Sequence, residues 1–442
     1  MAEQMKPSGI DWIGDIPESW KVRPLKYLAK CNQDVLLETT APDYSFRYVD
    51  IGSVTYERGI TGYQELRFED SPSRARRKVS VGDTIISTVR TYLKAIAIIS
   101  DSENVIVSTG FAVYTPDEAI YPQYLYYFCK SEGFVQEIDK NSYGIAYPAI
   151  NTDLLSRICI AYPCYEEQQA IADFLDKECA QIDSIAADLE KQIELLQQYK
   201  KSLITETVTK GLNKPVPMKD SGVEWLGKIP AHWNFKRLKF MLENSSDSMK
   251  VGPFGSALSG SDFTDEGKWV YNQRVVLDNN FSENTTFVSE EKFQEMRSFA
   301  VYPGDILITT RGTIGKVAIV PEGAKEGVLH PCIIKFRVDK EMIIPELLQL
   351  IFNESDFVKD QFTLMSNATT IEVIYSYSLK DILLPVIPAD EQTKIYGYLS
   401  KKCIVINGII AEKQKAFATI AQHKKSLIYE YVTGKKRVKE VQ

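Results

Sequence analysis

The side chains of this chain that could do chemistry are cations, amides and aromatic rings gathered near turns in both halves. Arg and Lys neutralise phosphate, and Arg, Asn and Gln also read base edges through paired hydrogen bonds. Loops of small polar and aromatic residues add surfaces that could line a groove. Contact with DNA is therefore one interpretation of the pattern. The candidate DNA-binding residues are Arg74, Arg76, Arg77, Arg90, Tyr92, Lys94, Tyr143, Tyr147, Ser256, Asn272, Arg274, Arg311, Thr313, Lys316, Asn367 and Thr369.

Each cluster also has a plainer interpretation. The basic run 74–78 could be solvated surface, and the cations at 90–94 and 311–316 could decorate exposed hairpins. The Gly-rich segment 251–263, which contains Ser256, could be a structural loop rather than a cradle for phosphate. The formal net charge of −7 counts mildly against a nucleic-acid partner.

Residue patterns for catalysis and cofactor binding are missing from the sequence. There is no GxGxxG, no Walker loop and no Asn-Pro-Pro-aromatic box for methylation of a base. Three histidines, with His330 standing alone, are too few and too scattered for a metal site. Seven cysteines without a CxxC pair indicate reduced, mostly buried thiols. We therefore expect no catalytic residues, no metal and no cofactor on this chain.

The elements that position the candidate residues occur twice. Residues 8–20 read SGIDWIGDIPESW, and residues 221–233 read SGVEWLGKIPAHW. The segment KKSLI at 200–204 returns at 424–428, and the Gly-Asp pair at 82–83 returns at 304–305. An internal repeat of two copies is typical of a pseudo-symmetric molecule whose halves do the same job on two targets.

Each copy holds a Trp box, a strand-rich middle and a long helix. The segments 84–99, 104–115, 305–320 and 330–338 are rich in β-branched and aromatic residues and predict strands. Residues 121–138 and 345–358 predict short helices. No apolar run of eighteen residues occurs, and the N-terminus lacks an apolar signal core, so a cytoplasmic protein is expected.

The long helices are expected at about 167–209 and 391–433, where apolar residues recur every seven positions. In 166–210 five lysines stand against ten acids, and in 390–434 seven lysines stand against four acids. Matching heptads with opposite charge predict that the helices pair with each other, antiparallel. The predicted seam consists of Leu175, Ile182, Leu189, Leu196 and Leu203, with Ile171, Ile185 and Tyr199 at alternate positions, and of Leu399, Ile406, Ile420 and Leu427, with Ile409 and Phe417 beside them and Lys413 as the odd member.

The predicted fold class is α+β, with two pseudo-twofold-related α+β domains separated by a long antiparallel two-helix coiled coil. The expected boundaries are 1–165 for the first domain with its Trp box, 166–212 for the first helix, 213–388 for the linker, second Trp box and second domain, and 389–442 for the second helix and basic tail.

These parts together resemble the specificity subunit of type I restriction–modification enzymes. The resemblance rests on the box G-[IV]-x-W-[IL]-G-x-I-P-x-x-W, the Glu-Gln start of each long helix and the KKSLI near its end, all present twice. It implies that each middle is a target recognition domain that reads one half of a bipartite, asymmetric DNA site. It also implies that the helices act as a spacer and dock two methyltransferase subunits, and through these the restriction subunits.

The resemblance assigns S-adenosylmethionine, ATP and magnesium to the partner subunits and no catalysis to this chain. Two other classes stay open at the level of sequence. One is a self-contained methyltransferase or nuclease with diverged motifs. The other is a coiled-coil scaffold without affinity for DNA.

Overall fold

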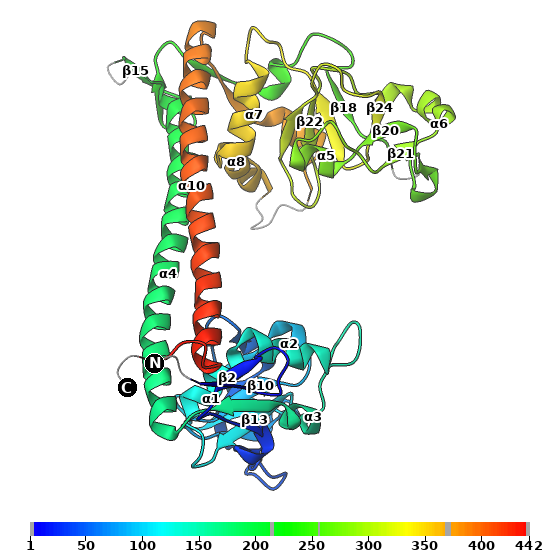
Figure 1. Ribbon diagram of the computed structural model, residues 1–442. Coiled ribbons are helices and arrows are strands. Elements are labelled where there is room, and N and C mark those ends of the chain that lie inside the picture. Colours follow the sequence, from blue (N-terminus) through cyan, green and yellow to red (C-terminus); the bar gives the residue numbers. More distant parts are fainter. Residues whose placement is uncertain (1–3, 213–215, 255–256, 367–372, 439–442) are drawn as a thin grey trace. The chain divides into compact units, whose positions relative to one another are not determined.

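The computed structural model describes residues 4–212, 216–254, 257–366 and 373–438. The chain divides into two compact units (Figure 1). Unit 1 comprises Met1–Glu190 and Lys415–Gln442, and unit 2 comprises Lys191–Gln414. Each unit therefore holds one Trp box, one strand-rich middle and a part of both long helices, α4 (Tyr165–Lys210) and α10 (Ala389–Val432).

Unit 1 is built on two four-stranded sheets. One has the order β11 (Ile96–Ile98), β10 (Thr84–Ser87), β13 (Phe111–Pro116) and β4 (Ala29–Cys31), all antiparallel. The other has the order β8 (Gln64–Arg67), β5 (Ser45–Val49), β12 (Val105–Ser108) and β9 (Ala75–Lys78), with β5 and β12 parallel. Short pairs join β1 (Met5–Pro7) to β2 (Asp15–Pro17), β3 (Lys21–Pro24) to β14 (Cys159–Tyr162) and β6 (Val54–Thr55) to β7 (Gly59–Ile60).

Unit 2 repeats the antiparallel sheet, whereas its second sheet has a different strand order, with one of the two parallel strands at the edge. Its antiparallel sheet has the order β18 (Met249–Val251), β25 (Ile333–Phe336), β22 (Ile306–Thr309) and β23 (Val317–Ile319). Its second sheet has the order β19 (Phe263–Thr264), β21 (Phe287–Val288), β20 (Lys268–Tyr271) and β24 (Gly327–Leu329), with β20 and β24 parallel. The pairs β15 (Met218–Asp220) with β16 (Lys228–Pro230) and β17 (Asn234–Arg237) with β26 (Leu383–Val386) correspond to β1–β2 and β3–β14 of unit 1.

The short helices differ from the sequence expectation. Residues 121–138 form two helices, α1 (Pro122–Lys130) and α2 (Glu132–Lys140), because Ser131 is extended between them, with φ −64° and ψ 145°. The expected helix 345–358 likewise breaks at Ser355, between α7 (Pro345–Glu354) and α8 (Phe357–Ser366). The remaining helices are α3 (Thr152–Arg157), α5 (Gln273–Asp278), α6 (Glu290–Glu295) and α9 (Ser376–Asp381).

The long helices run antiparallel within unit 1. The Lys424 ammonium lies 2.6 Å from the Asp183 carboxylate, and the Phe174 and Tyr431 rings lie 4.5 Å apart. A step forward along α4 is thus matched by a step backward along α10. The Asp183–Lys424 pair joins the acidic helix to the basic one, as the charge pattern predicts.

The same register holds within unit 2. Lys413 Nζ donates a hydrogen bond to Gln192 Oε1 at 2.5 Å, and Lys200 Nζ donates to Asn407 Oδ1 at 2.8 Å. Lys413, the odd member of the predicted heptad, is therefore accommodated by a hydrogen bond to a neutral amide on α4. The antiparallel pair that the heptads predict is confirmed in each unit.

One part of the predicted seam is wrong. Ile185 and Tyr199 are exposed, at 51% and 54%, as is Ile409 at 38%. A heptad seam alternates steps of four and three residues, and Ile185 lies three residues after Ile182 where a step of four is needed. The alternate positions of α4 are instead Cys179, Ala186, Ile193, Lys200 and Thr207, none of which is exposed. Ile171 is buried in the core of unit 1.

The Glu-Gln pair that starts each long helix fastens that helix to its unit. In unit 1 the Gln168 amide is fully buried, accepts from Tyr121 N at 2.8 Å and donates to the carbonyls of Ala119 and Pro163, each at 3.1 Å. Trp20 Nε1 donates to Glu167 Oε1 at 3.3 Å.

In unit 2 the equivalent pair makes the equivalent bonds. The Gln392 amide accepts from Ile344 N at 2.9 Å and donates to the carbonyls of Met342 and Ile387. Trp233 Nε1 donates to Glu391 Oε2 at 3.0 Å. The repeated motif is thus explained by buried hydrogen bonds rather than by a role on the surface.

Each long helix ends against a Trp box. Gly434 follows α10 with φ +71°, and a Cβ there would lie 2.5 Å from Pro17 and 3.2 Å from Trp20. Gly211 follows α4 with φ +78°, and a Cβ there would lie 3.3 Å from Trp233. Glycine is favoured at both places because other residues rarely adopt this left-handed conformation, and at Gly434 a Cβ would also clash with Pro17.

The buried Gln168 amide predicts a large loss of stability on its removal. Gln168→Ala leaves the Tyr121 N–H and two carbonyls without partners, so the free energy of unfolding of unit 1 should fall by about 3 kcal/mol. Gln169 is the next residue and is exposed, so Gln169→Ala should change the free energy of unfolding by less than about 0.5 kcal/mol. Urea denaturation of both variants measures the difference. Equal midpoints would contradict the assignment.

The repeated Gly-Asp pair carries a buried carboxylate with different surroundings in the two units. Asp305 Oδ2 accepts from Tyr302 N at 2.8 Å, and the carboxylate pairs with Lys335 and Arg337 at 3.3 and 2.5 Å. Asp83 makes the same bond, from Ser80 N at 2.7 Å, but it has no ion-pair partner among the described residues, although it is 2% exposed. Burial therefore raises the pKa of the Asp83 carboxyl.

The raised pKa of Asp83 predicts the direction in which the stability of unit 1 changes with pH. A pKa that is higher in the folded than in the unfolded chain means that the folded state binds the proton more tightly. The resulting stabilisation of the folded state is complete at low pH and is lost as pH rises through the raised pKa. Asp83→Asn should therefore gain stability relative to the wild type between about pH 4 and pH 8. Asp305→Asn should instead lose stability near neutral pH, because Lys335 is 2% exposed and loses a carboxylate. Denaturant midpoints measured across this range test both signs.

Candidate nucleic-acid interface

Two of the predicted clusters of unit 1 meet at one surface. β10 is followed by the 3-10 turn Thr91–Leu93, and the loop 141–150 lies between α2 and α3, where Figure 1 shows it standing out from the unit. Ile150 N donates to Thr88 O at 2.9 Å, and Val89 forms an antiparallel bridge with Ala149. The loop is thereby tied to the end of the central strand of a sheet, which is a rigid place from which to present side chains.

Arg90 and the aromatic residues of this surface face solvent together. The Arg90 guanidinium lies 5.5 Å from the centre of the Tyr147 ring. Tyr92, Tyr143 and Tyr147 are all more than half exposed. Arg90 adopts a left-handed conformation, with φ 51° and ψ 50°, which turns the chain at the strand end. The bridge between the strand end and the loop thus brings a cation and three phenol rings onto one exposed surface.

The other predicted cations of unit 1 are partly used by packing. The Lys94 ammonium lies 5.9 Å from the Tyr56 ring. Arg76 packs over Phe68 at 4.7 Å, and its Nε lies 3.5 Å from Glu38. Burial lowers the pKa of Arg77, whose buried Nε has no hydrogen-bond partner among the described residues.

Arg74, by contrast, is exposed at the turn before β9. Of the basic run, Arg74 is therefore the residue most open to a phosphate, while Arg76 and Arg77 are half-buried. Their roles as DNA contacts stay predictions.

Unit 2 has the same junction. Ile374 N donates to Thr310 O at 2.9 Å, and Arg311 forms an antiparallel bridge with Val373. The bridge aligns Arg311 with Val89, so Gly312, with φ +64°, takes the left-handed position that Arg90 holds in unit 1. Arg311 and Thr313 are exposed there. The predicted residues Ser256, Asn367 and Thr369 lie outside the described residues.

Lys316 has an internal role. Its Nζ donates to the Asn353 carbonyl at 2.7 Å, and Asn353 Oδ1 accepts from Val317 N at 2.8 Å. These bonds fasten the end of α7 to β23. Lys316 is thus turned toward the helix rather than grouped with Arg311.

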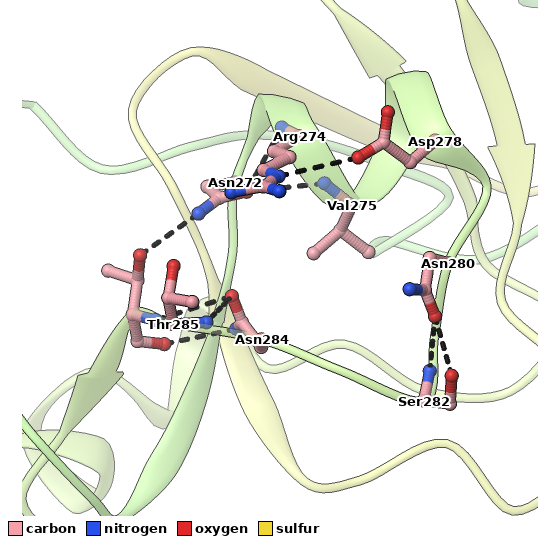
Figure 2. Close-up of polar contacts among 9 residues, drawn as sticks. Asn272, Arg274, Val275, Asp278, Asn280, Ser282, Asn284 and Thr285 are labelled. Atoms are coloured by element: carbon pink, nitrogen blue, oxygen red, sulfur yellow. Dashed lines mark hydrogen bonds and ion pairs between the residues drawn. The ribbon is translucent and has the colours of Figure 1, made fainter.

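Asn272 and Arg274 border a small polar hollow of about 80 Å³ around α5, drawn in Figure 2. Asn272 Oδ1 accepts from Arg274 N and Val275 N as the cap of α5, and its Nδ2 donates to Thr286 Oγ1 at 3.0 Å. Both ends of the Asn272 amide are therefore engaged within the chain. Arg274 is exposed and pairs only loosely with Asp278, at 3.4 Å, so its guanidinium remains accessible.

The sequence prediction missed two exposed aromatic or apolar features. Tyr375 and Tyr377 stack at 5.4 Å with an interplanar angle of 8°, and both are more than half exposed, directly after the bridge at Val373. Ile145, in the loop 141–150, is 104% exposed. The alternating tyrosines of 375–377 were a signal that could have been used, but an exposed isoleucine is not visible in sequence alone.

Across residues 4–212, 216–254, 257–366 and 373–438, no group of three or more His, Cys, Asp or Glu side chains is arranged to hold a metal ion. In the same ranges no helix is both long and apolar enough to cross a membrane.

The contrast between Lys316 and Arg311 predicts different effects on stability. Lys316→Ala removes a charge-assisted hydrogen bond to the end of α7, so it should lower the free energy of unfolding of unit 2 by about 2 kcal/mol. Arg311→Ala removes an exposed side chain and should change it by less than about 0.5 kcal/mol. Thermal and urea unfolding of the two variants distinguish them, and a larger loss for Arg311→Ala would show that the placement of these cations is wrong.

Comparison with known proteins identifies the family. The family model described as the type I restriction modification DNA specificity domain matches residues 17–195 and 250–416. The chain is 25% identical over 450 residues to the provisionally named MjaX specificity subunit of a type I restriction enzyme from Methanocaldococcus jannaschii, covering 97% of this chain and 96% of that protein. It is 22% identical over 310 residues to the EcoBI specificity subunit of Escherichia coli, covering 68% and 63%.

A solved structure shares the fold. It comes from work on complex assembly and conformational transition of the type I R-M system and superposes with a TM-score of 0.72 at 19% identity, covering 95% of this chain and 99% of that one. The α+β fold with long paired helices is confirmed by this likeness. Because the family model matches well over half of the sequence, in two stretches that correspond to the two copies of the repeat, the chain belongs to the type I restriction–modification DNA specificity family.

Proposed function

We propose that this chain is the non-catalytic DNA-recognition subunit of a type I restriction–modification complex, and that each unit reads one half of a bipartite, asymmetric site. The observation that carries the proposal is the repeated junction between a strand end and a loop. In unit 1 it presents Arg90 with Tyr147, and in unit 2 it presents Arg311 beside the Tyr375–Tyr377 stack. The frame is the same in both units, whereas the exposed side chains on it differ, as two different half-sites require.

The proposed partners are two methyltransferase subunits, with restriction subunits joined through them. Support comes from the long helices, on which several large apolar side chains remain exposed although their seam is filled. They are Ile185 in unit 1 and Leu195, Tyr199, Ile404, Val405 and Ile409 in unit 2. Apolar side chains gathered on exposed helix faces favour a protein partner. S-adenosylmethionine, ATP and magnesium would bind to these partners, because this chain has no sequence motif for them.

The two alternative functions, a self-contained enzyme and a scaffold without DNA affinity, each fail to account for a feature of the chain. A self-contained enzyme needs a cofactor loop and a reactive cluster, and the sequence has no glycine-rich nucleotide motif or methylation box. A scaffold without DNA affinity would have no use for two equivalent junctions with different cations and aromatic rings. The DNA-recognition proposal accounts for both features.

Exchange of one middle domain tests the proposal. Replacing residues 21–165 by the middle of a related protein should change one half of the methylated sequence and leave the other half intact, because base contacts carry sequence information and the helices do not. The measurement is mapping of methylated sites in cells that express the chain with its methyltransferase partner. The isolated chain, incubated with S-adenosylmethionine and DNA, serves as the control and should transfer no methyl groups. A site that changes in both halves, or methyl transfer by the isolated chain, would count against the proposal.

A further inference from the structure

We infer that Ile145 is an apolar wedge that enters the DNA of the half-site read by unit 1 and separates two stacked base pairs. The inference rests on the proposed function of unit 1 as a DNA reader and specifies how part of that reading is done. It differs from the expected reading by hydrogen bonds, because an isoleucine has no donor or acceptor to offer to a base edge.

The first support is the exposure of Ile145. Its exposed fraction of 104% is the highest among the large apolar residues exposed in the described ranges. Single apolar residues on a surface are common and need no explanation by themselves. The argument therefore depends on how the loop holds this residue and on what surrounds it.

The second support is the construction of the loop, which is closed at its base. Tyr143 and Ala149 exchange two backbone hydrogen bonds of 2.9 Å each, and Ala149 also bridges to Val89 at the strand end. Gly144 has φ +99°, and a Cβ on it would lie 3.1 Å from the Tyr147 carbonyl oxygen. A tight loop anchored to a sheet holds its tip in place before binding, so little conformational entropy is lost when the tip meets a partner.

The third support is the chemistry around the tip. Neither the segment 88–94 nor the segment 141–150 contains an acidic residue, although the whole chain has a net charge of −7. Tyr143 and Tyr147 lie on either side of Ile145 in sequence, both exposed, and the Arg90 guanidinium covers the Tyr147 ring. Phenol hydroxyls and a guanidinium are suited to sugar and phosphate, while the apolar tip is suited to the space between bases.

This combination matches the physics of wedges that act from the minor groove. Such proteins insert Ile, Leu, Phe, Met or Pro between base steps, unstack them and kink the duplex, while nearby cations hold the backbone. Unstacking costs least at flexible pyrimidine–purine steps. Unit 1 would therefore select its half-site partly through the deformability of one such step.

Fluorescence of 2-aminopurine tests the wedge in the assembled protein. The full chain is bound with its methyltransferase partner to duplexes of the mapped site, each carrying 2-aminopurine at one position of the half-site assigned to unit 1. The methylated base is excluded, because a base flipped out for methylation would also fluoresce. With the wild-type chain, fluorescence should rise at one base step, and the signal should be lost with Ile145→Ala.

Two variants serve as controls. Leu37→Ala removes another exposed apolar side chain of unit 1 and should retain the signal. Ile145→Leu keeps an apolar tip and should restore most of it. Ile145→Ala should also weaken binding of the specific site about tenfold, which corresponds to about 1.4 kcal/mol, and should leave thermal unfolding unchanged.

The outcomes separate the wedge from the function on which it rests. A complex that binds its site selectively but shows no fluorescence change, or the same change with Ile145→Ala, would overturn the wedge and leave the proposed function standing. A complex that shows no selective binding of DNA at all would overturn both.

Discussion

The buried hydrogen bonds at the start of each long helix are the constraint on which the rest of the structure depends. Gln168 and Gln392 each satisfy one backbone N–H and two carbonyls inside a unit, and the neighbouring glutamates accept from Trp20 and Trp233. An unpaired polar group at these depths would cost more than the bonds gain. The start of each helix is thus held in one place relative to the sheets beside it.

The end of each long helix packs against the Trp box that is hydrogen-bonded to the start of the other long helix. α10 closes on Trp20 through Gly434, and α4 closes on Trp233 through Gly211. Each unit is therefore completed by segments from two distant parts of the sequence, which explains why the boundaries of the units fall inside the helices rather than at their ends. The repeated motifs are in this sense mostly structural, and the proposed DNA-binding surfaces lie where the two copies differ.

The two units use different residues around the buried carboxylate and at the left-handed turn. The carboxylate of Asp305 is balanced by Lys335 and Arg337, whereas that of Asp83 is buried without a cation beside it among the described residues. The left-handed turn after the central strand is made by Arg90 in unit 1 and by Gly312 in unit 2. A frame that tolerates such exchanges can carry different exposed residues in the two units, as the proposed reading of two different half-sites requires.

The sequence by itself determined the repeat, the α+β class, the two long helices and their antiparallel pairing. These follow from local patterns: heptad spacing, charge of opposite sign and β-branched runs. It also located cations at both junctions and the aromatic residues of the junction in unit 1. Only the tertiary structure decided that Ile185 and Tyr199 face solvent, that Lys316 binds Asn353 and that the Asn272 amide caps α5. Whether a polar side chain is free or already engaged depends on partners far away in sequence, and no local pattern records them.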